Sequence, residues 1–284
     1  MPLQNLPVEI LDNILRLVGS DSLRKHEACC LPVSKWWYEL AEPILLEELV
    51  LSAHQLKRIP ENTIIKLQKS LRRLQIHIKP LPERQVDEEL INSLNNVLPR
   101  LLPKAARLQQ FDFIANGYFN PDKPLVSYKN YLGPWPLMNL VDILPFYILS
   151  DLTIDTMGSG VKTGEHICPR IASRIPSLRS IKLRMRCICL QVLEFDHHSK
   201  IEKIIINLSL KENNLLEAGF SHHCTEQIHA YDLNDAMVAA ATNIATKIPS
   251  IKMLRIMSHT HPGFETVTTD CINGSRMILS GDWK

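Results

Sequence analysis

From residue 46 onward, apolar residues repeat in the pattern L-x-x-L-x-L, with leucine, isoleucine or phenylalanine at each L position. The copies are Leu46/Leu49/Leu51, Leu71/Leu74/Ile76, Leu108/Phe111/Phe113, Leu149/Leu152/Ile154, Leu178/Ile181/Leu183, Ile201/Ile204/Ile206 and Ile251/Leu254/Ile256. The last two positions of each copy alternate, as on one face of a β-strand, and the first packs against the turn that enters the strand. Chance explains one or two copies in a chain rich in leucine and isoleucine, but seven copies predict seven strands.

Helical patterns fill the gaps between these strands. They cover residues 86–102, 166–176 and 233–249, and Pro176 and Pro249 end the last two just before a strand. A unit of one helix and one strand cannot bury its own apolar face, so neighbouring units must stack. The first positions of successive copies are 23 to 50 residues apart, which is longer and less regular than a strict leucine-rich repeat. We therefore expect an α/β fold, an irregular leucine-rich-repeat-like solenoid with a parallel sheet.

The last part of the chain has the pattern of a β-hairpin. Thr266–Asp270 is rich in β-prone residues, Asn273-Gly274 is a strong turn signal, and Arg276–Leu279 is the predicted return strand. A C-terminal β-hairpin at this position would close an edge of the sheet that is otherwise exposed.

The N-terminal segment has helical periodicity. Pro7 suits the start of a helix over residues 6–18, and Glu9 in its first turn complements the helix dipole. The apolar residues form two stripes, with Leu6, Ile10, Ile14 and Leu17 on one side and Leu11, Leu15 and Val18 on the other. We expect one side to pack within the chain and the other to need a partner. Leu17 and Val18 of this helix are assigned to the chain's own core. Leu40, in the helix predicted over residues 33–49, is assigned to the same core.

Two further short helices are predicted over residues 23–32 and 33–49, the second with Ser34 as a possible cap. Three short helices bury little apolar surface on their own. They should therefore lean on the rest of the chain or on another protein.

Composition and charge limit the classes of partner and the location that we expect for the protein. The 284 residues include 32 Lys and Arg against 30 Asp and Glu, a formal net charge of +2, which predicts no nucleic-acid partner and no anionic membrane partner. The first residues lack a basic start, and no run of about 18 apolar residues occurs, so we expect neither a secretory signal nor a membrane span. Seven cysteines without a C-x-x-C pair predict reduced thiols in an intracellular protein, cytoplasmic and/or nuclear.

Motifs for chemistry are weak. Gly158–Gly164 fits neither the dinucleotide nor the P-loop spacing and is interpreted as a turn. Cys187 and Cys189 extend an apolar strand by alternation and are interpreted as core thiols, while His197-His198 and His222-His223 are assigned to solvated loops. No nucleophile elbow accompanies the cysteines and histidines. We therefore predict no catalytic residue, no metal site and no cofactor.

The stretch Asn116–Pro136 concentrates aromatic residues where four prolines and two glycines oppose regular structure. It holds five of the chain's 17 aromatic residues: Tyr118, Phe119, Tyr128, Tyr131 and Trp135. Long irregular loops are uncommon unless functional, and Tyr and Trp are enriched where proteins bind one another. Two interpretations stay open, a substrate-contact loop and a loop folded back over the repeat core.

Two N-terminal segments, LPVEILDNILRLV and LPVSKWWYELAEPILLEELVL, resemble an F-box. The likeness covers about residues 4–50 and lies in Leu6-Pro7, Glu9-Ile10-Leu11, Ile14-Leu15, Val33-Ser34-Lys35-Trp36 and Leu40. Together with the strand-and-helix repeats and the ending Arg276–Trp283, it makes the chain similar to fungal F-box proteins.

The resemblance implies an F-box over residues 1–45 and a leucine-rich-repeat-like solenoid over residues 46–284. It implies a Skp-type adaptor bound by the F-box, a cullin reached through that adaptor, and an unknown protein substrate bound by the repeats. The protein would then be a non-enzymatic substrate-recognition adaptor of an SCF-type E3 ubiquitin ligase, which raises the local concentration of its target. The adaptor contacts carry over to Leu6, Pro7, Ile10, Leu11, Ile14, Leu15 and Trp36. The alternative is a non-enzymatic interaction scaffold that acts outside ubiquitination.

Overall fold

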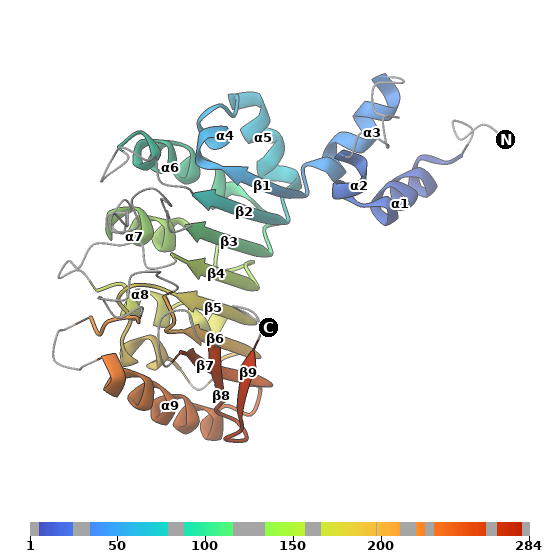
Figure 1. Cartoon of the computed structure of the whole chain (residues 1–284). Helices are drawn as coiled ribbons and strands as arrows, with labels where there is room; N and C mark the ends of the chain where they lie inside the picture. Colours follow the sequence, from blue (N-terminus) through green and yellow to red (C-terminus); the bar gives the residue numbers. More distant parts are fainter. Residues whose placement is uncertain are drawn as a thin grey trace.

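The computed structural model describes residues 6–24, 35–78, 88–115, 134–156, 166–196, 198–210, 220–224, 230–259 and 266–279 (Figure 1). Its strands form one mixed sheet in which they follow one another in chain order. They are β1 (Glu48–Ser52), β2 (Arg73–Ile78), β3 (Gln110–Ala115), β4 (Asp151–Asp155), β5 (Ser180–Arg184), β6 (Lys203–Asn207), β7 (Met253–Ser258), β8 (Thr266–Asp270) and β9 (Arg276–Leu279). The helices are α1 (Val8–Val18), α2 (Ser20–Arg24), α3 (Lys35–Leu45), α4 (Ala53–Lys57), α5 (Glu61–Ser70), α6 (Glu88–Leu101), α7 (Pro134–Ile143), α8 (Cys168–Ala172) and α9 (Ala230–Lys247). Three 3-10 turns complete the described elements: η4 (Leu102–Lys104), η5 (Ile175–Ser177) and η6 (Leu190–Leu193).

The seven strands predicted from the apolar repeat are confirmed as β1 to β7, which all run parallel. Their register aligns equivalent positions of the copies across the sheet. One row contains Leu49, Leu74, Phe111, Leu152, Ile181, Ile204 and Leu254. The next contains Leu51, Ile76, Phe113, Ile154, Leu183, Ile206 and Ile256. From β2 onward every member of both rows is buried, so the two rows form the sheet side of the core.

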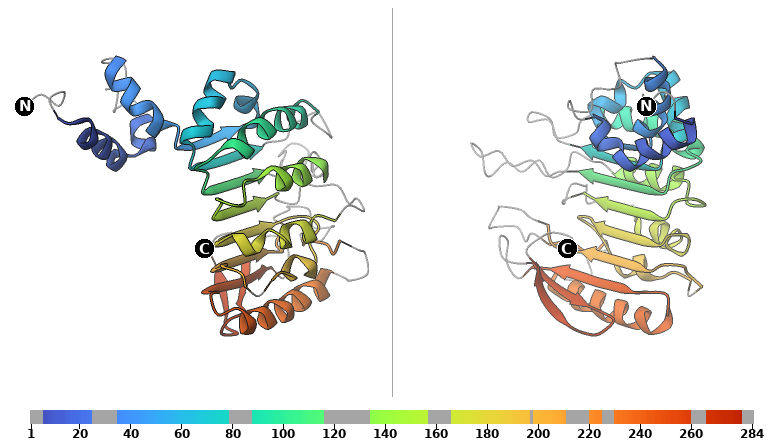
Figure 2. Two further views of the ribbon diagram at one scale, coloured as in Figure 1. Left: turned by 180° about the vertical axis from the view of Figure 1, so that it is seen from behind. Right: turned by 90° about the vertical axis from the view of Figure 1, so that its right-hand side faces the viewer.

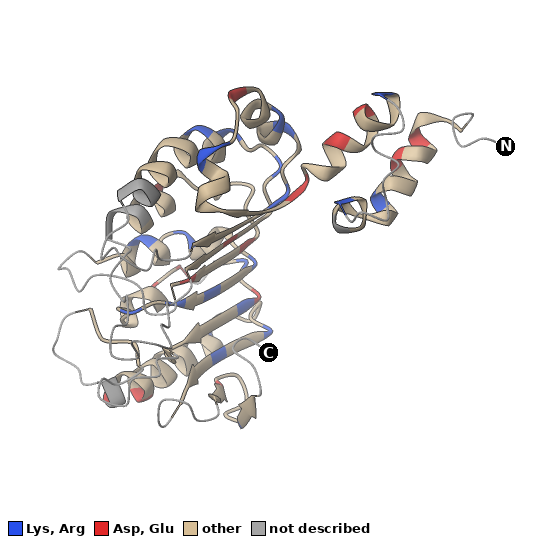
Figure 3. Ribbon diagram, turned by 45° about the horizontal axis from the view of Figure 1, so that its top comes forward, with Lys and Arg blue, Asp and Glu red and all other residues tan. Residues whose placement is uncertain are grey.

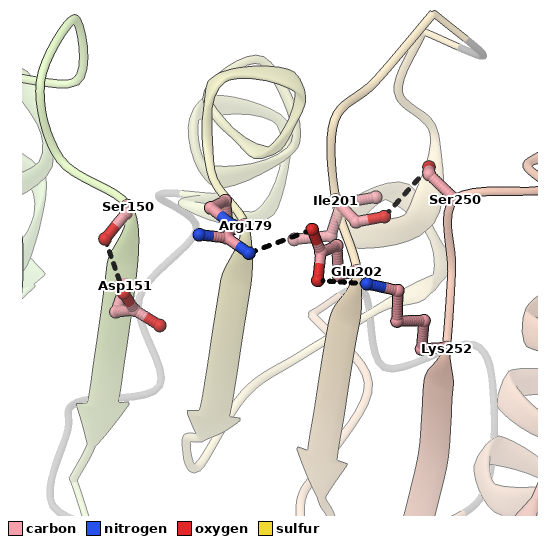
Figure 4. A network of polar contacts seen from close by, with 7 residues as sticks. All are labelled: Ser150, Asp151, Arg179, Ile201, Glu202, Ser250 and Lys252. Carbon is pink, nitrogen blue, oxygen red and sulfur yellow. Dashed lines mark hydrogen bonds and ion pairs between the residues drawn. The ribbon is translucent and has the colours of Figure 1, made fainter.

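A second repeated feature lies where the strands begin. The carbonyl of Ser150, for example, accepts hydrogen bonds from the N–H groups of Arg179 at 2.8 Å and Ser180 at 3.0 Å. The residue after the first apolar position does the same in successive copies: Glu47, Arg72, Gln109, Ser150, Arg179 and Glu202. Side chains add to this edge, since Glu202 accepts from Arg179 at 3.1 Å and from Lys252 at 2.9 Å (Figure 4). The copies are therefore equivalent in backbone geometry although their lengths differ.

The helices that connect the parallel strands lie on one side of the sheet (Figures 1 and 2). Those predicted over residues 86–102 and 233–249 are confirmed as α6 and α9. The single helix expected over residues 166–176 is wrong, because α8 ends at Ala172 and η5 follows it. Pro176 explains the break, since its ring would clash with the carbonyl four residues earlier. Among the described residues, every helix is too short or too polar to cross a membrane.

The predicted C-terminal hairpin is confirmed as β8 and β9, which pair antiparallel with the expected strand bounds. β8 also pairs antiparallel with β7 and thereby covers the edge of the last parallel strand. Gly274 in the connecting turn has φ 72°, a left-handed conformation that glycine adopts at little cost.

α1, α2 and α3 project beyond the β1 end of the sheet and have a small core of their own (Figure 1). That core contains Leu15, Leu23, Ala41 and Ile44. The third helix is shorter than predicted, since α3 ends at Leu45 and β1 begins three residues later. The second helix begins earlier than predicted, since α2 covers Ser20–Arg24, and residues 25–34 with Ser34 lie outside the described part of the chain.

Polar contacts attach the three helices to the start of the sheet. Glu42 of α3 accepts a hydrogen bond from Lys66 of α5 at 2.6 Å. Arg24 at the end of α2 donates to the carbonyls of Leu45 and Glu48. These contacts join the N-terminal helices to the elements that begin the repeats.

Candidate functional site

α1 is an amphipathic helix whose boundaries follow from its sequence. Pro7 precedes the first helical residue, and its carbonyl accepts from the N–H groups of Ile10 at 3.0 Å and Leu11 at 3.2 Å. Gly19 ends the helix with φ 79°, and its N–H donates to the Leu15 carbonyl at 3.0 Å. The helix therefore places residues 10, 14 and 17 on one stripe and residues 11 and 15 on the adjacent one.

One stripe is buried and the other is exposed, as the sequence pattern predicted. Leu11 is fully buried and Leu15 nearly so, within the N-terminal helices. Ile10 and Ile14 are exposed, and Leu17 is 87% exposed. An apolar stripe left in water beside one that is buried is typical of a surface that binds another protein.

The assignment of Leu17 and Val18 to the chain's own core is wrong. Leu17 is the most exposed large apolar residue among the described residues, and Val18 is 42% exposed. For Leu17 the reason is helical geometry, because it follows the exposed Ile14 by three positions and extends the same stripe. Val18 belongs by position to the stripe of Leu11 and Leu15, but it is the last residue of α1. Leu40 is half-buried and packs against the small core, as expected.

The residues predicted to contact an adaptor divide into two groups. Pro7, Ile10 and Ile14 are exposed, Trp36 is 36% exposed and Leu6 is half-buried. Leu11 and Leu15 lie inside the chain's own core, where they have no surface to offer a partner. The exposed face of α1, which we define as Pro7, Ile10, Ile14, Leu17 and Val18, is therefore the candidate interaction face.

Two tryptophans on α3 extend the apolar character of the N-terminal helices. Trp36 lies at the surface, whereas Trp37 packs against the small core. Their rings meet edge to face, with centroids 5.4 Å apart and planes at 75°. Trp37 therefore anchors Trp36 in a defined position at the surface.

Ionic contacts on the opposite side of α1 set its orientation. Arg16 donates from Nε to Asp12 at 2.7 Å and also pairs with Glu47, the residue just before β1. The hydrogen bond to Asp12 and then the one to Glu47 raise the pKa of Arg16, so its guanidinium stays charged. Because Arg16 holds this side toward the sheet, the exposed apolar stripe faces away from the repeats.

A second surface is the sheet face that is turned away from the helices. Lys182 of β5, Lys203 of β6 and Arg255 of β7 lie on it, and basic residues on these strands are visible in Figure 3. Burial, and then the charges of Lys182 and Arg255, lower the pKa of Lys203. Arg255 also lies 3.9 Å from Asp270 of β8. This face gathers positive charge on neighbouring strands of an otherwise nearly neutral chain.

The aromatic stretch lies mostly outside the described residues, which include none of Tyr118, Phe119, Tyr128 and Tyr131. Its end departs from the expected irregular loop, because α7 begins at Pro134 and Trp135 lies in its first turn. Proline at the start of a helix explains this, since its missing N–H is not needed there. The Gly158–Gly164 turn also lies outside the described residues.

The structure brings together four side chains that the sequence pattern did not connect: His166, Cys168, Cys189 and Cys224. Their ligand atoms all lie within 4.8 Å of one another. The interpretation of Cys189 as part of a strand is wrong, because β5 ends at Arg184 and Cys189 directly precedes η6. Hydrogen bonds from Cys168 and then Cys224 lower the pKa of Cys189, and the contact with Cys189 raises the pKa of Cys168.

Comparison with known proteins adds no relative. No protein-family model matches the chain, and no curated protein matches its sequence. The functional argument therefore stands on the residues and their geometry.

Proposed function

We propose that the chain is the substrate-recognition subunit of an SCF-type E3 ubiquitin ligase. An N-terminal F-box binds a Skp-type adaptor, and a leucine-rich-repeat-like solenoid presents the target. The chain carries out no chemistry itself and acts by holding its target near the ubiquitin-conjugating machinery. The observation that carries this proposal is the exposed apolar face of α1, beside a buried stripe on the same helix.

Three features support the F-box part. The sequence order of Leu6-Pro7, the Glu9-Ile10-Leu11 step and the Lys35-Trp36 element resembles that family. The N-terminal helices have their own small core, as a separate module needs. The apolar face of α1 is presented away from the repeats, so a partner could bind it without displacing the chain's own contacts.

The repeated geometry of the sheet supports the solenoid part. In each copy the carbonyl just before the strand accepts hydrogen bonds from backbone N–H groups of the next copy. The same two apolar positions of each copy lie in register across the sheet. Stacking of this kind is what joins the units of repeat proteins, each of which contacts its neighbours. The spacing of 23 to 50 residues means that the connections differ in length, while the strands they join keep the same register.

Affinity purification of the 284-residue chain tests the proposal. The wild-type chain is compared with a Leu6→Ala/Pro7→Ala double variant, and recovered proteins are identified by mass spectrometry. We expect the wild type to recover a Skp-type adaptor and a cullin, and the variant to lose both while its thermal unfolding is unchanged. Recovery of an adaptor without a cullin favours the alternative, a scaffold outside ubiquitination. Absence of an adaptor from the wild-type sample contradicts the proposal.

The aromatic stretch is proposed as a target contact within this function. Replacement of Tyr128 and Trp135 by alanine is expected to reduce recovery of the target while the adaptor is still recovered. A loss of stability with target recovery unchanged would instead show that the stretch covers the repeat core.

A further inference from the structure

We propose that His166, Cys168, Cys189 and Cys224 form a structural zinc site of the Cys3His type. It is independent of adaptor binding, because the four residues lie in the β4–β7 part of the chain and not in the N-terminal helices. Zinc is the metal expected for one imidazole and three thiolates in a closed four-ligand site.

The four ligand atoms lie within 4.8 Å of one another, and two of the distances between them can be compared with those of a tetrahedral zinc site. The Sγ atoms of Cys168 and Cys224 lie 3.7 Å apart. Zinc–sulfur bonds of about 2.3 Å place two sulfur atoms of a tetrahedral site about 3.8 Å apart, so this edge already fits. His166 Nε2 lies 2.8 Å from Cys189 Sγ, and this edge must open by about 0.8 Å when a shared ion replaces their hydrogen bond. A side-chain adjustment of that size needs no change of fold.

Three separate segments hold the ligands in place. His166 and Cys168 lie at the start of α8, and Cys189 precedes η6, which packs against α8. Cys224 ends the segment 220–224, which backbone hydrogen bonds fix beside residues 186–188. In particular, the His222 N–H donates to the Arg186 carbonyl at 2.7 Å, and the Ile188 N–H donates to the His222 carbonyl at 3.0 Å. The cluster is therefore positioned by the fold and not by sequence spacing.

Burial distinguishes this cluster from a chance group of surface residues. Cys168 and Cys189 are buried, and His166 and Cys224 are half-buried. The core cluster that contains Cys168 and Cys189 is apolar, and Ile171 of α8 and Val192 of η6 belong to it, each only 1% exposed. When zinc binds, the thiol protons are released to solvent, and the charge of the ion offsets the charges of the buried thiolates.

The described helical elements that carry the site are short. α8 has five residues and η6 has four, whereas α6 has 14 and α9 has 18. Elements this short bury too little apolar surface to hold their position alone, and small units commonly use a metal for that purpose. A zinc ion bound to all three segments would fix the layer over β5 and β6.

Metal analysis of the chain purified under reducing conditions tests the proposal. We expect about one zinc per chain, as the site has one set of four ligands. After removal of zinc with a chelator, titration with Co²⁺ alone is expected to give the absorption bands of a tetrahedral thiolate-bound ion. Chelation is also expected to lower the thermal unfolding temperature.

Single variants locate the site. Cys168→Ser, Cys189→Ser and Cys224→Ser are each expected to lower the zinc content at least tenfold. Cys187→Ser is the matched control, because Cys187 lies on the same segment as Cys189 but outside the four-ligand set, and it should keep its zinc. If the ligand variants do not fold, the Co²⁺ titration of the wild-type chain alone shows whether a tetrahedral thiolate site is present.

The outcomes that overturn the proposal are equally definite. A folded wild-type chain without zinc that gives no tetrahedral Co²⁺ spectrum has no such site. A mass two hydrogens below the reduced value, mapped to Cys168 and Cys224, assigns the cluster to a disulfide instead. Zinc retained by all three ligand variants and lost from the Cys187→Ser control places the metal elsewhere.

Discussion

Arg184 of β5 donates two hydrogen bonds to Asp155 of the neighbouring strand β4, from Nε at 2.8 Å and from Nη2 at 2.6 Å. The two residues also face each other in the strand register. Both side chains are almost completely buried, with 3% and 4% exposed. Because removing one member leaves the other charge buried without this partner, we expect Asp155→Asn to lower the free energy of unfolding by about 3–5 kcal/mol. Urea unfolding followed by circular dichroism measures it.

The matched control is the exposed pair of Arg179 and Glu202, which lie 3.1 Å apart directly before β5 and β6. Glu202→Gln removes the same kind of interaction in water, so its effect on stability should be much smaller. An equal loss for Asp155→Asn and Glu202→Gln would contradict the role of burial.

Lys203 provides a prediction about pH. Burial, and then the charges of Lys182 and Arg255, lower its pKa in the folded state. The folded chain therefore binds fewer protons here than the unfolded chain, and stability should rise with pH up to the ordinary range of a lysine. Lys203→Met should remove this rise and raise the free energy of unfolding at pH 7 by up to about 0.5 kcal/mol.

Thermal unfolding of the Lys203 variant at several pH values checks this prediction. Lys200→Met is the control, because Lys200 is exposed and lies three residues away on the same segment. If Lys203→Met is less stable than the wild type at every pH, the proposed repulsion of Lys203 by Lys182 and Arg255 is contradicted.

Gly274 in the β8–β9 turn allows a test of backbone conformation alone. Its φ of 72° lies in the left-handed region, and no atom lies within 4 Å of the position a Cβ would occupy. Gly274→Ala should therefore cost about 1 kcal/mol through backbone strain, without any clash. Gly274→Asn should cost less, since asparagine visits this conformation more readily. Equal stabilities of the alanine and wild-type chains in urea unfolding would show that the turn has another conformation.

The sheet was the most predictable part of the molecule. Leu74 and Ile76 lie two residues apart, and this spacing alone puts both on one strand face, as it does in each of the other copies. The hairpin was equally predictable, because Asn273-Gly274 is a local turn signal. Such features depend on neighbours in the sequence, and therefore the sequence predicts them well.

Features that depend on distant segments were not predictable. Cys189 and Cys224 are 35 positions apart, and only the pairing of residues 186–188 with residues 220–224 brings them together. The division of α1 was predictable only in part, because periodicity shows two stripes but not which one the rest of the chain covers. Leu17 was therefore assigned to the core, although it lies on the stripe that the chain leaves exposed.

Binding of the chain to a purified Skp-type adaptor, measured by calorimetric titration, tests the central claim most directly. We expect Ile14→Asp and Leu17→Asp each to weaken binding at least about 30-fold, which corresponds to about 2 kcal/mol for a central apolar contact. Ile65→Asp is the control, because Ile65 is an exposed isoleucine on α5, and its dissociation constant should match the wild type. A wild-type chain that does not bind the adaptor, or α1 variants that bind as tightly as the control, would contradict the proposed function.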